Sequence, residues 1–278
     1  MFRLQLRNEL RKLFGKKRTY IGFGAFFVAQ MLMCVFLRFS RAQGDLATLL
    51  AGNGYIAENY VSALTIAVYM LIPQIALLMP LYTTLVGGDM VAKEAEDGTL
   101  RMILSRPVSR FRLMFLKWLT GVVFSFSLVL VLGGVAVGIA RLWFPWKGMF
   151  IFIPEFVFSV LDADNGLKLY VWSQLFLATN AVVGFSIAFM FSCFNMKPAA
   201  ATILALSVLF LNAVIDLIPF FERYREFFLP HHLRSWLYVF AQPTPWGRLG
   251  ESQCILLGVS LTVFIIGAAA FQMRDIKS

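Results

Sequence analysis

The sequence predicts an all-α fold, a polytopic membrane bundle of six transmembrane helices in a single domain over residues 1–278. Three observations support this class: 59% of the residues are hydrophobic, only 14% are charged, and the apolar runs are continuous and helix-length. Soluble domains carry about 25% charged residues. A transmembrane barrel would show alternating segments of about 10 residues instead. Helices are therefore the expected spanning elements, since they satisfy their own backbone groups in lipid.

Six apolar runs come near the ~20 residues that a spanning helix needs. The predicted spans are 20–37, 61–86, 118–140, 169–194, 199–220 and 254–271. A seventh run, Met149–Leu161, is too short to span and contains Pro154 and Glu155, so we expect an interfacial or re-entrant helix there. Pro73 and Pro80 should kink the second span.

Lys and Arg are distributed unevenly over the segments between the spans. With the N-terminus inside, segments 1–19, 87–117, 195–198 and 272–278 hold 16 of the 25 basic residues. The outer segments 38–60, 141–168 and 221–253 hold the other nine. Positive charge collects in cytoplasmic loops, so we predict a multi-pass protein of the cytoplasmic (inner) membrane with both termini in the cytoplasm. No segment is large enough for a nucleic-acid-binding domain, and we expect no nucleic-acid partner.

The N-terminal segment 1–19 is predicted to hold an amphipathic elbow helix on the inner membrane surface. At about 100° per residue, its apolar side chains share one arc and its basic ones lie off that arc. The apolar set is Phe2, Leu6, Leu10, Leu13 and Phe14, and the basic set is Arg7, Arg11 and Lys12. A plain positive anchor ahead of the first span is the alternative.

The most structured polar stretch, within segment 87–117, separates the second and third spans. Residues 89–97 are helix formers, and Gly98 is placed as a helix stop. Thr99 can cap a short second turn, which Pro107 should end. Ser109 can cap the third span. An ordinary solvated loop is the alternative, but such a loop would not need two caps and a proline.

Two further patterns concern the outer segments and the third span. The outer segments 141–168 and 221–253 are rich in aromatic residues and prolines, which predicts short interfacial helices that anchor in the headgroup layer. Gly134 and Gly138 form a small-xxx-small pair, expected to pack within the chain rather than to form a dimer seam.

The sequence contains no recognisable catalytic constellation. It has neither a phosphate-binding G-x-x-x-x-G-K-[ST] loop nor an H-E-x-x-H pattern. His231 and His232 are adjacent and would diverge on a helix, which favours hydrogen bonding over metal binding. Titratable residues within the spans are scarce beyond Asp216, which argues against an ion-coupled carrier. We therefore expect no enzyme activity, no metal and no cofactor in this chain.

Three segments resemble the permease (transmembrane) subunit of type-2 ABC exporters. One reads Glu-Ala-Glu-Asp-Gly-Thr-Leu at 94–100 and continues as Leu-Ser-Arg-Pro-Val-Ser-Arg at 104–110. The segments Arg7–Lys12 and Phe271–Ile276 resemble weaker end motifs of that family. The resemblance implies a coupling helix at about 89–98 that docks on a cytoplasmic ABC ATPase. It also implies two such ATPase subunits, which bind ATP and Mg, and a second permease chain, identical or homologous, in the same membrane lipid.

The resemblance also assigns roles to residues. ATPase coupling falls to Asp89, Lys93, Glu94, Glu96, Asp97, Gly98, Thr99, Leu100 and Arg101. The rest of the cytoplasmic motif is Ser105, Arg106, Pro107, Ser109 and Arg110, and the elbow contributes Phe2, Leu6, Arg7, Leu10, Arg11 and Phe14. Glu94 and Glu96 lie about 200° apart around a helix, so we expect Glu94 to face the ATPase and the other to pair locally, for example with Arg101.

On this resemblance the chain couples ATP hydrolysis by a separate ATPase to export across the membrane. The alternative is a non-transporting assembly or signalling subunit that keeps the permease fold and binds an ATPase.

The predicted orientation has a direct test. In a cysteine-free background, an impermeant thiol reagent added outside intact cells should label Arg234→Cys but not Glu96→Cys, because the Lys and Arg distribution places 221–253 outside and 87–117 inside. The opposite labelling pattern would overturn this topology.

Overall fold

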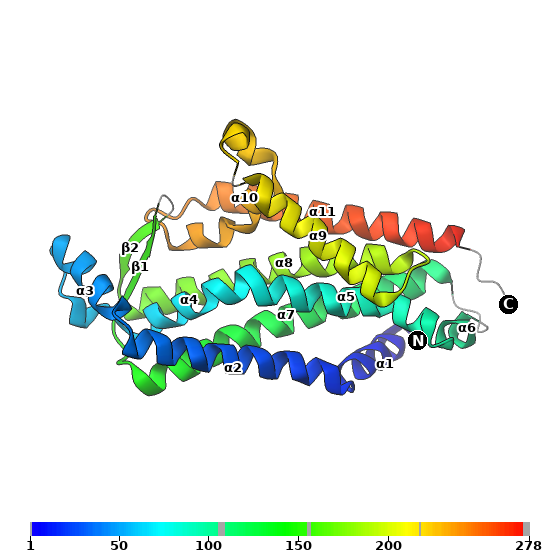
Figure 1. Cartoon of the computed structure of the whole chain (residues 1–278), viewed down its shortest axis with the longest axis horizontal. Coiled ribbons are helices and arrows are strands. Elements are labelled where there is room, and N and C mark those ends of the chain that lie inside the picture. Colours follow the sequence, from blue (N-terminus) through cyan, green and yellow to red (C-terminus); the bar gives the residue numbers. More distant parts are fainter. Residues whose placement is uncertain (1, 105–108, 155–156, 217, 275–278) are drawn as a thin grey trace.

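The computed structural model describes residues 2–104, 109–154, 157–216 and 218–274. Within these ranges the chain forms one elongated helical bundle (Figure 1). Six helical segments are long and apolar enough to cross a membrane. They are α2 (Lys17–Phe39), α4 to α5 (Ala63–Glu96), α7 (Arg110–Trp143), α8 (Ala163–Cys193), α9 (Pro198–Asp216) and α11 (Trp246–Met273). The predicted all-α bundle with six spans is confirmed.

The two ends of the bundle differ in content. Helices α1 (Phe2–Phe14) and α6 (Thr99–Leu104) lie with the last turn of α11 at one end, which we call the terminal end (Figure 1). The opposite hairpin end carries α3 (Ala42–Gly52) and a β-hairpin. The start and the end of the described chain therefore share one end of the bundle, as an even number of spans requires.

The second span departs from a regular helix at its two prolines. Helix α4 (Ala63–Pro73) and helix α5 (Met79–Glu96) are joined by η2 (Gln74–Leu78), a single π-helical turn. Proline removes one backbone donor and clashes with the preceding turn, and the wider π turn relieves that conflict here. Helix α5 then continues without a break to Glu96, so the acidic stretch is the end of span two and not a separate helix.

Helix α8 forms the centre of the bundle, since it is the most buried span, whereas α2 and α9 expose most of their surface. Two glycines allow α5 to pack closely against its neighbours. A side chain at Gly87 would start 2.5 Å from the Phe185 carbonyl oxygen on α8, and one at Gly88 would start 2.3 Å from the Thr202 hydroxyl on α9.

The prediction of a helix at Met149–Leu161 is wrong. This run forms an antiparallel hairpin of β1 (Met149–Ile153) and β2 (Val157–Leu161). Its β-branched and aromatic residues favour a strand, and α4 completes the hydrogen bonding of β1. The Thr65 hydroxyl accepts from the Phe150 amide at 2.9 Å. The Tyr69 hydroxyl accepts from the Phe152 amide at 3.0 Å and donates to the Phe152 carbonyl at 3.1 Å.

The expected packing of Gly134 and Gly138 inside the chain is also wrong. Both are exposed, with no atom within 4 Å of a side chain placed there. Gly133 instead faces Gln174 on α8. The buried face of α7 thus contains Gly133 but neither Gly134 nor Gly138. Which of these glycines is buried depends on how α7 is rotated about its axis.

The third predicted outer segment, 221–253, which we call the outer segment from here on, folds back into the bundle. It comprises η3 (Pro219–Phe227), α10 (Leu229–Leu233) and η4 (Ser235–Phe240), so short helices are present here as predicted, whereas segment 141–168 contains the β-hairpin instead. Trp236 and Phe240 are nevertheless buried within the protein, so membrane anchoring is the wrong role for them. Polar side chains hold the segment in place: His232 lies between the Glu226 carbonyl at 2.9 Å and the Ser252 hydroxyl at 3.2 Å.

Candidate functional site

The acidic end of α5 is shaped by local turn chemistry. Helix α5 stops at Glu96, and Gly98 adopts a left-handed φ of +71° that glycine tolerates best. The Thr99 hydroxyl donates to the Glu94 carbonyl at 3.2 Å, so it ties the start of α6 back to α5. Ser109 does cap α7, since its hydroxyl accepts from the Arg112 amide at 3.3 Å. Ser105, Arg106 and Pro107 lie outside the described residues.

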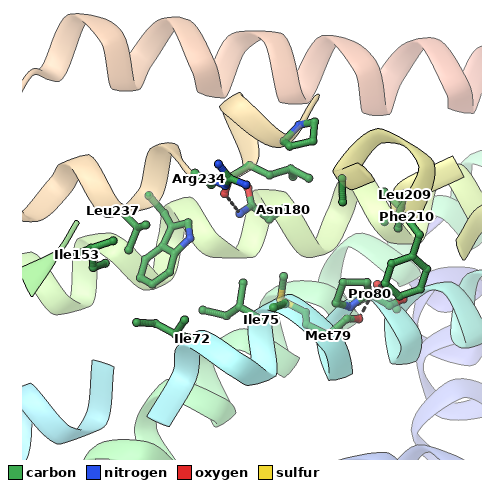
Figure 2. Close-up of a pocket in the computed structure, with 17 residues that line it drawn as sticks. Ile72, Ile75, Met79, Pro80, Ile153, Asn180, Leu209, Phe210, Arg234 and Leu237 are labelled. Atoms are coloured by element: carbon green, nitrogen blue, oxygen red, sulfur yellow. Dashed lines mark hydrogen bonds between the residues drawn. The ribbon is translucent and has the colours of Figure 1, made fainter. Parts of the chain in front are cut away.

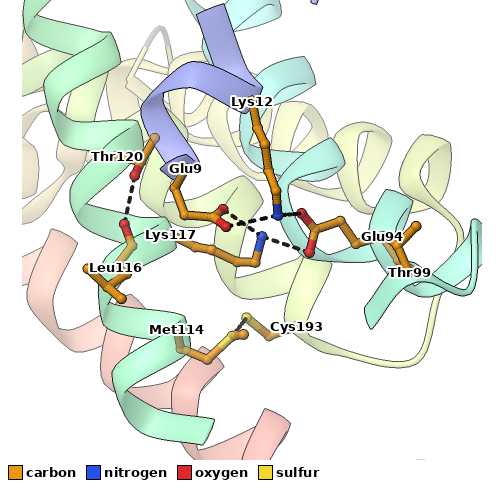
Figure 3. A network of polar contacts seen from close by, with 9 residues as sticks. All are labelled: Glu9, Lys12, Glu94, Thr99, Met114, Leu116, Lys117, Thr120 and Cys193. Carbon is orange, nitrogen blue, oxygen red and sulfur yellow. Dashed lines mark hydrogen bonds and ion pairs between the residues drawn. The ribbon is translucent and has the colours of Figure 1, made fainter. Parts of the chain in front are cut away.

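Four charged side chains from three helices meet at the terminal end, and we call them the charge cluster (Figure 3). The Lys117 ammonium on α7 lies 3.0 Å from a Glu9 oxygen on α1 and 2.8 Å from a Glu94 oxygen on α5. Lys12 on α1 lies 3.1 Å from the other Glu9 oxygen and 3.5 Å from the other Glu94 oxygen. The two carboxylates therefore alternate with the two ammonium groups, and the cluster has no net charge.

Because the cluster is largely buried, the pairing of its charges matters for the stability of the protein. The Lys117 side chain is only 1% exposed, and an unpaired ammonium there would be strongly destabilising. Burial by itself raises the pKa of Glu9, but Lys117 and then Lys12 outweigh it, so the Glu9 pKa lies below its usual value. Burial likewise lowers the pKa of Lys12, but Glu9 and Glu94 outweigh it and leave that pKa raised. Glu9 and Lys12 are thus held in their charged forms.

The orientation of the acidic residues differs from the prediction. Glu94 was expected to face an ATPase, but its side chain is 14% exposed and points to Lys117. Glu96 and Asp97 are the exposed carboxylates at 48% and 52%, with Lys93 3.9 and 4.0 Å away. We call Glu96, Asp97 and Gly98 the acidic tip. The side chain of Arg101, the suggested local partner, lies outside the described residues.

Sequence reasoning missed Glu9 and Lys117 as a pair. Each carried a signal: Glu9 is the single acidic residue in 1–19, and Lys117 directly precedes the apolar run of the third span. Neither signal identifies a partner that is 108 positions away along the chain.

Other predicted residues also meet at the terminal end. Arg18 lies 3.1 Å from Asp89, which links the start of α2 to α5. Arg110 donates to the carbonyl oxygens of Gln272 and Arg274 at 3.2 and 3.0 Å. Leu100 is also buried. Asp89 is therefore tied to the start of α2, and Arg110 to the end of α11.

The elbow residues divide largely by their periodicity, although Phe2 of the predicted apolar set is 39% exposed. Arg7 and Arg11 are exposed, whereas Leu6 and Leu10 are half-buried. The aromatic residues pack against α7: the ring centroid of Phe14 lies 6.2 Å from that of Phe124, and that of Phe2 lies 6.4 Å from that of Phe115. The apolar face of α1 thus contacts protein as well as any surrounding lipid. Over the described ranges, no group of three His, Cys, Asp or Glu side chains could hold a metal ion.

Loss of the buried cation should destabilise the protein severely. We expect Lys117→Met to reduce the free energy of unfolding by about 3–5 kcal/mol, because it leaves Glu9 and Glu94 buried without their main partner. The exposed Lys12→Met is the matched control and should cost about 1 kcal/mol or less. Denaturant unfolding of the purified protein in bicelles measures both values, and equal losses would contradict the central role of Lys117.

The cluster also predicts a pH dependence. The folded pKa of Glu9 is below its ordinary 4.5, so its stabilisation is complete above pH 4.5 and is lost as the pH falls through the folded value. Lys12 has a folded pKa above its ordinary 10.5, so its contribution is complete below pH 10.5 and is lost as the pH rises through the folded value. The stability difference between wild type and Glu9→Gln should therefore shrink in acid, and a difference that stays constant down to pH 2 would refute this.

Comparison with known proteins now places the chain in a family. Residues 6–224 match the family described as ABC-2 family transporter protein. The match spans more than half of the chain and includes the charge cluster, the acidic tip and five of the six spans. Comparison with curated proteins gives no match. The chain therefore belongs to the ABC-2 transporter family and is a multi-pass membrane transport subunit of the permease type.

Proposed function

We propose that this permease couples ATP hydrolysis on two cytoplasmic ATPase subunits to substrate export, together with a second permease chain, identical or homologous. Membership of the ABC-2 family supports an ABC ATPase as the partner. ATP and Mg would bind to that partner and not to this chain. The observation that carries the proposal is the charge cluster, which joins the end of α5 to α1 and α7 directly behind an exposed acidic tip.

The acidic tip offers a docking surface and a rigid path inward. Glu96 and Asp97 present exposed carboxylates at the end of a continuous helix of 18 residues. A displacement of this tip by an ATPase would move Glu94, and through Lys117 it would also move α7. Close packing of α5 on α8 at Gly87 resists bending of the helix between the tip and the π turn. We therefore assign docking to Glu96 and Asp97 and transmission to Glu94.

The same proposal places the terminal end in the cytoplasm. Segments 1–19 and 87–117 carry 13 of the 25 basic residues, and both lie at that end. Positive charge of this kind favours the cytoplasmic side of the inner membrane. The exposed apolar surfaces of α2 and α9 would be covered by lipid or by the second permease chain.

The test separates docking from transmission. Glu96→Lys should weaken retention of the ATPase about tenfold, equivalent to ~1.4 kcal/mol, because it reverses an exposed interface charge. Glu94→Gln should leave ATPase retention near wild type but lower transport per ATP hydrolysed, since it breaks the contact to Lys117. Glu58→Lys, an exposed carboxylate at the other end of the bundle, is the matched control.

Co-purification with the ATPase and transport in proteoliposomes at matched protein levels measure these effects. Wild-type docking and transport for both Glu96→Lys and Glu94→Gln would refute the proposal. Normal docking of the wild type without any transport would favour the non-transporting assembly or signalling subunit instead.

A further inference from the structure

A pocket of about 390 Å³ lies beside the π turn of the second span, beneath the outer segment (Figure 2). Its walls come from η2 and α5, from α8, from α9 and from α10 with η4. Ile75, Met79, Leu209 and Trp236 represent its mostly apolar lining. This volume falls in the range of ~300–1,000 Å³ that is typical of ligand sites.

Among the described residues, one buried polar atom in the pocket has no partner. Asn180 on α8 is 5% exposed, and its side-chain nitrogen donates to the Leu233 carbonyl at 2.6 Å. Its side-chain oxygen is buried without a hydrogen bond. A buried acceptor of this kind is unfavourable until a donor reaches it. The pocket therefore presents one oriented acceptor within an apolar wall.

The charges at the pocket cancel. Arg234 lines the pocket, and its guanidinium lies 2.7 Å from the buried Asp216 carboxylate. An ionised ligand would have to be desolvated with no net opposite charge to receive it, which is costly. The site consequently favours an uncharged ligand.

The opening of the pocket faces the side of the bundle. Ala76 on the π turn and Ala213 on α9 are exposed lining residues, and Phe210 is 45% exposed. All three belong to membrane-spanning segments. A ligand would therefore enter sideways from the hydrocarbon layer and not from water.

We propose that this pocket binds one uncharged, mostly hydrocarbon molecule that carries a hydroxyl or amide N–H group and donates it to the Asn180 side-chain oxygen. The unpaired Asn180 oxygen selects for a ligand that carries a hydrogen-bond donor. The paired charges of Arg234 and Asp216 select against ions, and the lateral opening selects for molecules dissolved in lipid. The existence of this binding site does not depend on the proposed function. Its assignment as the site of the export cargo does rest on that function.

The experiment compares two ligands on the unaltered protein. Full-length chain in phosphatidylcholine nanodiscs is photolabelled with a diazirine-bearing dodecanol and, separately, with its methyl ether, which lacks the donor. We expect the alcohol to label peptides around the pocket roughly fivefold more than the ether, as one hydrogen bond allows. No ATPase is present, so the result is independent of coupling.

Two variants place the labelling in the pocket. Ala76→Trp should reduce alcohol labelling at least fivefold by filling the opening. Leu77→Trp is the matched control, since Leu77 lies in the same π turn, is 60% exposed and does not line the pocket, and it should label as wild type. Asn180→Leu should remove the preference for the alcohol over the ether.

Three outcomes would overturn the proposal. Equal labelling by alcohol and ether would identify the occupant as an ordinary lipid chain. Undiminished labelling of Ala76→Trp would place the ligand elsewhere. A change of oligomeric state in Ala76→Trp but not in Leu77→Trp, with alcohol labelling retained, would show that a second copy of the chain covers the opening.

Discussion

Neutralisation of the Lys117 ammonium is the constraint on which the terminal end depends. The side chain is almost fully buried on α7, and its two counter-charges come from Glu9 on α1 and Glu94 on α5. Apolar packing alone would allow these helices several rotations, but one arrangement brings both carboxylates to the same nitrogen. A buried ion pair adds little net stability over an apolar equivalent, whereas its disruption is costly. We infer that the cluster specifies geometry more than it adds stability.

Helix α5 connects the charge cluster and the acidic tip with the pocket. Its last turns carry Glu94 and the acidic tip, and its first turn supplies Met79 and Pro80 to the pocket. The π turn lies directly before it, where the regular hydrogen-bond pattern is interrupted. A rigid helix that ends at such a turn would convert a displacement at the tip into a change of pocket shape. This physical path agrees with the proposed role of the chain in ATP-driven transport.

The outer segment closes the pocket through polar contacts within the spans. Asn180 bonds the Leu233 carbonyl, and Arg234 pairs with Asp216 at the end of α9. In a bilayer such polar groups are expensive unless they find partners. The outer segment supplies those partners, and the same contacts hold it over the pocket. Trp236 and Phe240 of this segment are therefore core residues of the protein, and the polar contacts help to hold them there.

The sequence by itself determined the six spans, the glycine stop at Gly98, the cap at Ser109 and the resemblance to the family. These features depend on composition and turn preferences, which act within a few residues. Tertiary structure decided the rest. Glu94 and Glu96 look alike in sequence, and only the position of Lys117 on another helix makes Glu94 the buried one. The run Met149–Leu161 became a hairpin because α4 satisfies its edge. Contacts between distant segments set these outcomes, and in the hairpin they act together with residues that favour a strand.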